Sequence, residues 1–348
     1  MNPYILATLL FGLGLGTTIT FASSHWLLAW MGLELNTLAI IPLMAQLHHP
    51  RAVEATTKYF LTQAAAAATL LFASITNAWL TGQWEIQQLS HPLPITMITL
   101  ALALKIGLAP LHAWLPEVLQ GLDLTTGLIL STWQKLAPFA LLLQIQPTNP
   151  NLLILLGLTS TLVGGWGGLN QTQLRKILAY SSIAHLGWMI LILQFSPQLT
   201  FFTLMAYFIM TASAFLTFKI YTSTNINALA TSWAKAPALT AFTPLILLSL
   251  GGLPPLTGFM PKWLILQELT KQDLALIATL AALTALLSLY FYLRLSYAMA
   301  LTISSNTLTA TAPWRFTSSR PTLPLASTTS LATCLLPLTP AMVALLTI

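Results

Sequence analysis

Long apolar runs follow one another along the whole chain and are separated by short polar connections. A helix needs about 20 mostly apolar residues to cross the hydrocarbon core of a bilayer, where every backbone polar group must be bonded internally. The pattern therefore predicts an all-α polytopic membrane protein with eleven transmembrane helices. The longest polar stretch, 302–321, is expected to be a surface linker before the last helix. The expected spans are about 3–23, 25–46, 57–80, 94–118, 124–145, 150–170, 174–195, 198–220, 237–267, 273–299 and 323–346.

Charged residues are scarce, because 13 Lys and Arg and 7 Asp and Glu make up only 6% of 348 residues. An average globular domain carries roughly 25%, so this chain lacks the charge to cover a water-soluble surface. The net charge of +6 is never gathered into a basic patch. Composition therefore excludes a soluble enzyme, a disordered protein and a nucleic-acid binder.

The single cysteine, Cys334, limits the redox chemistry that the chain could perform. One thiol can form no internal disulfide, and it cannot complete an iron–sulfur cluster or a structural zinc site. No other arrangement of residues in the sequence suggests a metal, nucleotide or nucleophile site. We therefore expect no metal and no cofactor in this chain, and any electron transfer to occur in partner subunits.

Positive charges lie on alternate connections, which predicts the orientation. Lys271 is the one cation on an odd connection outside the spans. The positive-inside rule puts the N-terminus and the even connections on the side of synthesis, and eleven spans take the C-terminus to the other side. The N-terminus carries no cleavable targeting pattern, so 3–23 is expected to be a true span. The cations on even connections are Arg51, Lys58, Arg175, Lys176, Lys219, Lys235, Arg294, Arg315 and Arg320.

A repeat relates residues 107–117 (GLAPLHAWLPE) to residues 252–262 (GLPPLTGFMPK) at a constant offset of 145, with five of eleven positions identical. The copies lie in the fourth and ninth spans, so an odd number of spans separates them and the repeat is inverted. Inverted repeats with helices interrupted by Gly and Pro mark the working site of many transporters. Two unrelated proline kinks are the alternative. The expected helix breaks are at Gly107, Pro110, Gly252, Pro254 and Pro255.

The repeat also predicts the domain organisation. We expect a single membrane domain over 1–348, with repeat one at about 1–145 and repeat two at about 150–299. The linker and the last helix occupy 300–348. A glycine cluster at 164–168 is expected to allow close helix packing.

Four ionisable side chains lie within the expected spans: Glu34, Lys105, Lys135 and Lys262. Inserting one charged side chain at the centre of a transmembrane helix costs about 2.5–3.5 kcal/mol, and such groups usually serve ion or proton pathways. A carboxylate that moves towards or away from a lysine changes whether the protonated or the neutral lysine is favoured. We therefore expect proton translocation through these four residues. The alternative is a static buried ion pair that helps the helices assemble, and Lys262 could instead reach the interface.

Two histidines could relay protons, because imidazole titrates near neutrality. His112 lies beside the first break and His185 lies within a span, although packing roles are equally open for both. Glu117 and Asp123 flank a connection, where a solvated turn is favoured over a proton exit. The remaining histidines are expected at interfaces, and they are His25, His48, His49 and His91.

Three segments, 105–117 (KIGLAPLHAWLPE), 180–187 (YSSIAHLG) and 251–263 (GGLPPLTGFMPKW), resemble a known family. The chain is similar over essentially its whole length to subunit 2 of mitochondrial NADH:ubiquinone oxidoreductase, respiratory complex I, in a vertebrate-like form. The same segments resemble those of cation/proton antiporter subunits. Bacterial members have fourteen spans, so the chain looks like the shortened animal form that lacks the first three. One flank is then left for lipid or accessory subunits to cover.

The resemblance implies roles for the buried groups. Glu34 is the carboxylate that partners Lys105, Lys135 is the connecting lysine, and Lys262 is the lysine of the second broken helix. His112 and His185 lie on the hydrophilic axis between them. Leu250 stands where the repeat would echo Lys105, so the ionisable groups are not symmetric.

The expected function is that of a complex I membrane subunit that moves protons across the inner mitochondrial membrane, with its N-terminus on the matrix side and its C-terminus in the intermembrane space. NADH, FMN, iron–sulfur clusters and ubiquinone are expected on partner subunits. Other membrane and accessory subunits and inner-membrane lipids are the expected partners, and no nucleic acid is. A stand-alone cation/proton antiporter and a purely structural spacer are the alternatives.

Overall fold

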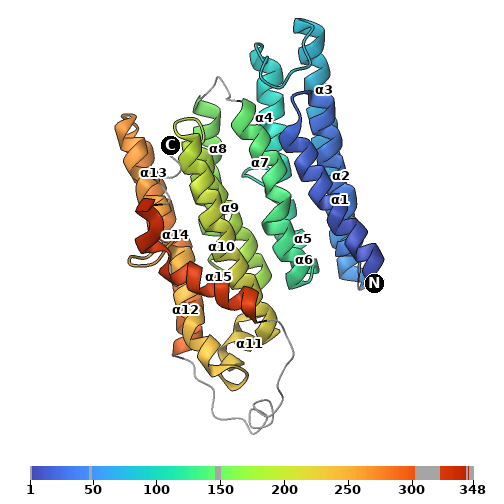
Figure 1. Ribbon diagram of the computed structural model, residues 1–348. Coiled ribbons are helices and arrows are strands. Elements are labelled where there is room, and N and C mark those ends of the chain that lie inside the picture. The colour runs from blue at the N-terminus through green and yellow to red at the C-terminus, as the bar shows by residue number, and fades with distance from the viewer. Residues whose placement is uncertain (1, 47–48, 146–149, 302–321, 342–343, 345–348) are drawn as a thin grey trace. The chain divides into compact units, whose positions relative to one another are not determined.

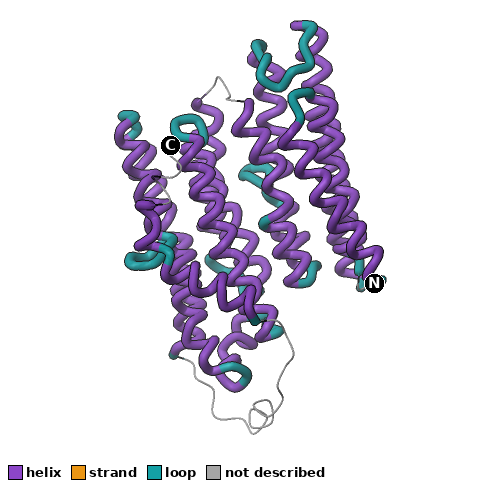
Figure 2. The backbone as a smooth tube through the Cα atoms, in the orientation of Figure 1, coloured by secondary structure: helices purple, strands orange, loops and turns teal. Residues whose placement is uncertain are grey.

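The computed structural model describes residues 2–46, 49–145, 150–301, 322–341 and 344 (Figure 1). Within these ranges the backbone forms helices and loops and no strand (Figure 2), which confirms the all-α class. Several expectations fall outside the described residues. They are the interfacial His48, the cations Arg315 and Arg320, the linker 302–321 and the last part of the expected span 323–346.

The chain forms two compact units, residues 1–156 and 157–348. In the first unit α1 packs along α2, α3 packs against α2, α4 and α5, and α7 contacts α1, α2 and α4 (Figure 1). The helices are α1 (Pro3–Ala22), α2 (Trp26–Met44), α3 (Pro50–Thr81), α4 (Pro92–Ile106), α5 (Trp114–Gly121), α6 (Leu124–Ser131) and α7 (Trp133–Ile145), followed by α8 (Pro150–Gly168), which begins in the first unit and ends in the second.

In the second unit α10 lies against α9, α12, α13 and α15, and α14 contacts α9, α11, α12 and α13. The short helix α15 lies across α10 and α12 (Figure 1). The elements are α9 (Leu174–Ile192), α10 (Pro197–Tyr221), α11 (Ile226–Ala230), the 3₁₀ helix η1 (Thr231–Ala234), α12 (Pro237–Gly251), α13 (Phe259–Lys271), α14 (Ala275–Ala300), α15 (Leu323–Cys334) and the 3₁₀ helix η4 (Leu336–Leu338).

Glycines bring helices together at backbone distance in both units. A Cβ added at Gly32 of α2 would lie 2.8 Å from the carbonyl oxygen of Gly16 on α1. A Cβ at Gly164 of α8 would lie 2.6 Å from the amide nitrogen of Ala184 on α9, and one at Gly165 would lie 2.8 Å from Leu287 Cβ on α14. Small residues therefore permit close packing, as we predicted for the cluster at 164–168.

Most helices begin and end within a few residues of the expected spans, and three differences have a local cause. The helix α3 begins at Pro50, before the expected start at 57, because proline suits a first turn and the His49 Nδ1 atom accepts the Arg51 N–H at 3.2 Å. A hydropathy pattern marks the part of a helix that lies in lipid and does not include the polar turns beyond it. The expected span 124–145 contains two helices, α6 and α7, interrupted at Thr132.

The third difference concerns the C-terminal region. The expected span 323–346 contains an α-helix of 12 residues, Leu323–Cys334, followed by a 3₁₀ turn, Leu336–Leu338. Pro337 lies in that turn, and proline cannot donate the hydrogen bond that would continue the α-helix. Over the described residues, the apolar run is therefore a short helix, a 3₁₀ turn and further helical residues at 339–341 and 344.

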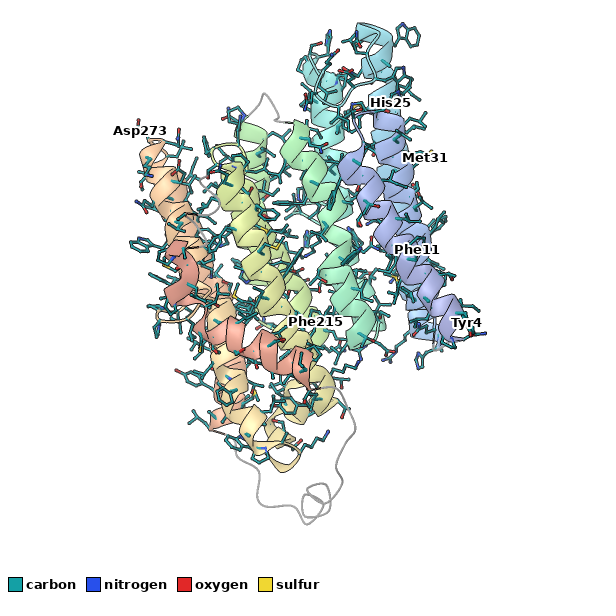
Figure 3. All side chains as sticks on the ribbon, viewed as in Figure 1. Tyr4, Phe11, His25, Met31, Phe215 and Asp273 are labelled. Carbon is teal, nitrogen blue, oxygen red and sulfur yellow. The ribbon has the colours of Figure 1, made fainter. Side chains whose placement is uncertain are left out.

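The outer faces of the helices are apolar. Tyr4, Phe11 and Met31 point away from α1 and α2 with exposed fractions of 80%, 68% and 47%, whereas Phe215 of the second unit is buried (Figure 3). Such surface suits lipid or neighbouring membrane helices rather than water. In the described part, seven helical segments are long and apolar enough to cross a membrane: Pro3–Ala22, Trp26–Met44, Pro50–Thr81, Leu124–Ile145, Pro150–Gly168, Pro197–Tyr221 and Ala275–Ala300.

Candidate functional site

The first helix break lies at the predicted position in the first unit. The helix α4 ends at Ile106, and Gly107 has a positive φ of 87°, a conformation that glycine adopts without steric cost. The amides of Gly107 and Leu108 both donate to the Ala103 carbonyl oxygen at 2.9 Å: the bond from Leu108 is the 6→1 bond of a Schellman cap, and the bond from Gly107 is that of an αL cap. The next helix, α5, begins only at Trp114. Lys105 is thus held in the last turn of α4.

The carbonyl groups at the end of α4 receive side-chain donors. The Trp114 indole Nε1–H donates to the Leu104 carbonyl oxygen at 3.0 Å. The Gln63 Nε2 atom, on α3, donates to the Lys105 carbonyl oxygen at 3.4 Å. Helix ends that are buried need such partners because their last four carbonyls have none within the helix.

Lys105 and Lys135 line the same cavity, although they lie on different helices, α4 and α7. Their side chains are almost fully buried, with exposed fractions of 6% and 2%. The cavity offers about 20 Å³ to the centres of water molecules, and one water needs roughly 10–15 Å³ of such space. Its polar lining also includes Asn36, Tyr59, Gln63, Trp114 and Gln134.

Two of the polar groups that line this cavity are unsatisfied. Among the described residues, the Lys105 Nζ atom has no hydrogen-bond partner, and neither has the Oδ1 or Nδ2 atom of Asn36. The Asn36 carbonyl oxygen accepts from Gln134 Nε2 at 3.3 Å. Buried polar groups of this kind are usually bonded to protein or water, so the cavity has the polarity and the volume that an internal water requires.

Glu34 lies on α2 and is half-buried. Its carboxylate accepts a hydrogen bond from Thr37 Oγ1 at 3.0 Å and acts electrostatically on Lys105 and Tyr59. The ion pairs of the described residues are Lys58–Glu54, Lys58–Glu117 and Lys271–Glu268. Glu34 and Lys105 therefore form no ion pair in the described part of the chain, and their functional pairing stays a prediction.

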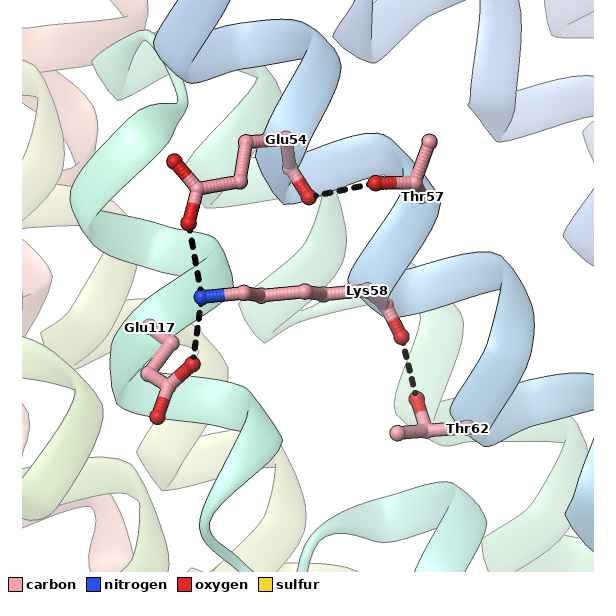
Figure 4. A network of polar contacts seen from close by, with 5 residues as sticks. All are labelled: Glu54, Thr57, Lys58, Thr62 and Glu117. Atoms are coloured by element: carbon pink, nitrogen blue, oxygen red, sulfur yellow. Dashed lines mark hydrogen bonds and ion pairs between the residues drawn. The ribbon is translucent and has the colours of Figure 1, made fainter.

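Lys58 of α3 binds two carboxylates, one on its own helix and one on α5 (Figure 4). Its Nζ atom lies 2.8 Å from Glu54 one turn earlier on α3 and 2.9 Å from Glu117 on α5. All three side chains are well exposed. Glu117, in the first turn of α5, is thus an exposed residue of the segment that follows the first break, in an ion pair that the sequence did not indicate.

The second unit contains the second break. The helix α12 ends at Gly251, and Gly252 has a positive φ of 78°. The Leu253 amide donates to the Leu248 carbonyl oxygen at 3.3 Å. Lys262, in the first turns of α13, donates from Nζ to the Gly251 carbonyl oxygen at 2.8 Å. The lysine thereby bonds to the C-terminal end of a helix, where a positive charge is favourable.

Lys262 and His185 line one cavity in the second unit, with about 20 Å³ open to water centres. The His185 ring lies 5.6 Å from the Tyr207 ring, centroid to centroid. His112 lies in the loop after the first break, and its Nδ1 atom is 3.3 Å from the Pro110 carbonyl oxygen. It is not among the residues that line the Lys105 cavity. The structure thus brings together Lys105 with Lys135, and Lys262 with His185.

Sequence reasoning missed the polar residues that surround the lysines. Asn36 follows Glu34 by two residues, and Gln134 directly precedes Lys135. Gln63 precedes a run of alanines in an apolar span. Uncharged polar residues in these spans were the available signal. Trp114 gave none, because an indole in an apolar helix is ordinarily a packing residue.

Comparison with known proteins supports the fold and gives the family. Residues 23–288 match the family model for the transmembrane part of NADH:quinone oxidoreductases and Mrp antiporters, and residues 289–343 match the model for the C-terminus of NADH dehydrogenase subunit 2. A chain of the Thermus thermophilus respiratory complex I is similar at a TM-score of 0.87 and 30% identity, over 98% of this chain and 80% of that one. An archaeal membrane-bound sulfane sulfur reductase shares the fold at a TM-score of 0.86 and 19% identity, over 98% of this chain and 74% of the other. The class is therefore that of antiporter-like membrane subunits.

Curated relatives narrow the class. The chain is 77% identical to NADH-ubiquinone oxidoreductase chain 2 of Tetraodon nigroviridis and 75% identical to that of Salmo salar, over 100% of both chains in each case. This chain belongs to the NADH-ubiquinone oxidoreductase chain 2 family. The resemblance inferred from the three segments is confirmed.

Proposed function

We propose that this chain moves protons through its buried lysines. The chain is a membrane subunit of NADH:ubiquinone oxidoreductase, the enzyme that transfers electrons from NADH to ubiquinone. In our proposal Glu34, Lys105 and Lys135 load and pass protons in the first unit, and Lys262 passes them on in the second. His185 and His112 are the proposed relays.

The shared cavity of Lys105 and Lys135 carries this proposal. Two lysines that are almost fully buried line one space with room for water, and an internal water can pass a proton between amines that do not touch. The Glu34 carboxylate is close enough to act on Lys105, so its movement towards or away from Lys105 would favour proton uptake or release.

Lys262 receives the proton later in the proposed sequence. Its ammonium bonds to the end of α12 at Gly251, and His185 lines the same cavity. An imidazole can take a proton on one ring nitrogen and release one from the other, so His185 suits a relay to or from Lys262. Release then occurs on the side of the membrane opposite to uptake.

We also propose the finer topology: eleven spans, with the two broken helices as inverted repeats within a single membrane domain. The hydrogen bonds at the breaks support the repeat, because Leu108 N to Ala103 O in the first has its counterpart, at the offset of 145, in Leu253 N to Leu248 O in the second. The cation distribution supports a matrix-side N-terminus and a C-terminus in the intermembrane space of mitochondria. Antibodies against a C-terminal epitope should bind when the outer face of the inner membrane is exposed. Binding only when the matrix face is exposed would contradict this orientation.

The redox groups of the enzyme, namely NADH, FMN, iron–sulfur clusters and ubiquinone, belong in this proposal to partner subunits. Other subunits and lipid cover the apolar outer faces, such as those of α1 and α2.

The experiment compares Lys105→Ala and Glu34→Ala in the assembled complex, reconstituted in vesicles, with Lys271→Ala as the control. Lys271 is an exposed lysine in an ion pair with Glu268. A positioned proton-transfer group contributes about 10²–10⁴-fold to a rate, so we expect coupled turnover to fall at least tenfold in the first two variants and to stay unchanged in the control. Unchanged rates and proton-to-electron ratios in both would refute the proposal.

The same experiment addresses the two alternatives. A structural spacer predicts loss of assembly with normal coupling in every complex that does assemble. A stand-alone antiporter predicts that the purified chain exchanges cations for protons in liposomes without any redox partner.

A further inference from the structure

The two broken helices are closed by different donors. Both α4 and α12 are followed by a glycine with positive φ, and both have a carbonyl in the last turn that accepts from a side chain of the next helix. At the first break the donor is the indole N–H of Trp114, the first residue of α5. At the second it is the ammonium of Lys262, the fourth residue of α13.

The sequences of the two segments account for this difference. The position aligned with Trp114 is Phe259, which has no N–H to donate, and the position aligned with Lys262 is Glu117. Glu117 is engaged with Lys58, and an ionised carboxylate only accepts hydrogen bonds. At these two positions, the helix that follows each break therefore offers one suitable donor, and only the donor of the first break carries no titratable proton.

The choice of donor matters for Lys105. The end of a helix carries partial negative charge that attracts a nearby cation, and Lys105 lies in that last turn of α4. Because Trp114 bonds to the Leu104 carbonyl and Gln63 to the Lys105 carbonyl, these two acceptors are already occupied. The Lys105 Nζ atom makes no hydrogen bond among the described residues and lies in the cavity that Lys135 also lines.

Trp114 is itself held in place. Its side chain is 8% exposed, and its ring meets the Tyr59 ring edge-on with centroids 5.7 Å apart. A rigid, buried aromatic donor keeps its bond whatever charge Lys105 carries.

We propose that Trp114 is a positioning residue for Lys105: its indole N–H closes the end of α4 and so leaves the Lys105 ammonium available to the cavity shared with Lys135. This inference deepens the proposed function and rests on the role given there to Lys105. Without the indole N–H, we expect the Lys105 ammonium to take its place as a donor to the helix end, as Lys262 does at the second break.

The test uses Trp114→Phe, which keeps an aromatic ring and removes the N–H. The matched control is Trp233→Phe, because Trp233 Nε1 also donates to a backbone carbonyl oxygen, that of Met299, at 2.7 Å. Both variants are examined as assembled complex in vesicles, together with Lys105→Ala. The measurements are the proton-to-electron ratio, the rate of coupled NADH oxidation, the KM for ubiquinone, and a cryo-EM map that resolves the Lys105 side chain.

We expect Trp114→Phe to assemble, to keep the KM for ubiquinone and to lose coupled turnover about two- to tenfold, the effect of one hydrogen bond on a population. In its map the Lys105 Nζ atom should lie within hydrogen-bond distance of a carbonyl of the last turn of α4. The control should match the parent in rate and ratio.

Three results would overturn the inference. One is a Trp114→Phe complex with the parent's rate and ratio. Another is a slower variant in which the Lys105 ammonium has not moved, which would make Trp114 merely structural. The third result does not depend on the assembly of Trp114→Phe. It is a map of the unmodified complex in which Lys105 already donates to an α4 carbonyl. If Lys105→Ala also keeps the full ratio, the proposed function fails; if Lys105→Ala loses it and Trp114→Phe does not, only this inference fails.

Discussion

Replacing Gly252 by alanine should separate the stability of the second break from its function. Gly252 has a φ of 78°, and a Cβ there would lie 2.9 Å from both Cδ and Nζ of Lys262. Gly82, at the end of α3, offers a matched control, because its φ is 73° and a Cβ added there would meet no atom within 4 Å.

The two substitutions share the cost of a positive φ in a residue other than glycine, and they differ in the contact that the added methyl group makes. A residue other than glycine in the left-handed region costs about 1–2 kcal/mol, and Gly252→Ala and Gly82→Ala share this loss of stability. The contact at Gly252 is with a flexible side chain, which can move away from the added methyl group. That movement breaks the 2.8 Å bond from Lys262 to the Gly251 carbonyl. A hydrogen bond from a charged group contributes about 1.5–3 kcal/mol, so the bonded arrangement should become about 10- to 150-fold less populated.

The assay measures two quantities on the assembled complex. Thermal dissociation of the chain from the complex, followed on native gels, reports stability, and acidification or alkalinisation of vesicles per electron reports coupling. We expect the loss of stability in Gly252→Ala to exceed that in Gly82→Ala by no more than the broken bond contributes, about 1.5–3 kcal/mol, and we expect loss of coupling in Gly252→Ala alone. Equal coupling in Gly252→Ala and Gly82→Ala would refute the reasoning that the Lys262 bond matters, and a much larger thermal shift in Gly252→Ala would show that Lys262 cannot move aside.

Three further substitutions follow from the packing and polar contacts. Gly32→Ala forces a methyl group against the Gly16 carbonyl of α1 and should reduce the thermal stability of the assembled chain by about 1–3 kcal/mol, whereas Gly14→Ala, where no atom lies within 4 Å, should be neutral or slightly stabilising on the same native-gel assay. Lys58→Met removes two exposed ion pairs and should lower the dissociation temperature only slightly, and this difference should shrink when thermal dissociation is repeated at high salt. Arg294→Met removes the guanidinium donors to the Leu169 and Gln171 carbonyls and should cost about 1–3 kcal/mol for each carbonyl left buried without a partner; an unchanged dissociation temperature would contradict this.

The positions of the breaks were predictable, and their chemistry was not. Gly107 and Gly252 mark the ends of α4 and α12, and a glycine followed closely by proline in an apolar run is typical of a helix end. The donor at each break depends on which side chain of the following helix folds back. Trp114 and Lys262 occupy different positions in their segments, so only the three-dimensional arrangement shows that both bond to a helix end.

The lysines illustrate the same limit. Their scarcity in an apolar sequence singles out Lys105, Lys135 and Lys262, but a sequence cannot tell which of them share a space. The pairing of Lys105 with Lys135 depends on α7 lying against α4, and such contacts between distant segments leave no trace in hydropathy. The functional pairing of Glu34 with Lys105 stays a prediction, which the loss of coupling in Glu34→Ala would support.

The length of α3 has a consequence for the distance between the Lys105 cavity and water. The helix has 32 residues and is therefore about 48 Å long, whereas the hydrocarbon core is about 30 Å thick. Even at a tilt of about 40°, the upper end of the usual range, it would extend over roughly 37 Å, so one end must leave the core. Its first turns carry Arg51, Glu54 and Lys58 and are the end that does so.

Because Lys58 binds Glu117, α5 reaches the same aqueous boundary. The Lys105 cavity is lined by Trp114 and Leu115 at the start of this eight-residue helix, which is about 12 Å long. The insulating layer between a buried lysine and bulk solvent is therefore thin on this side, less than half of the hydrocarbon thickness.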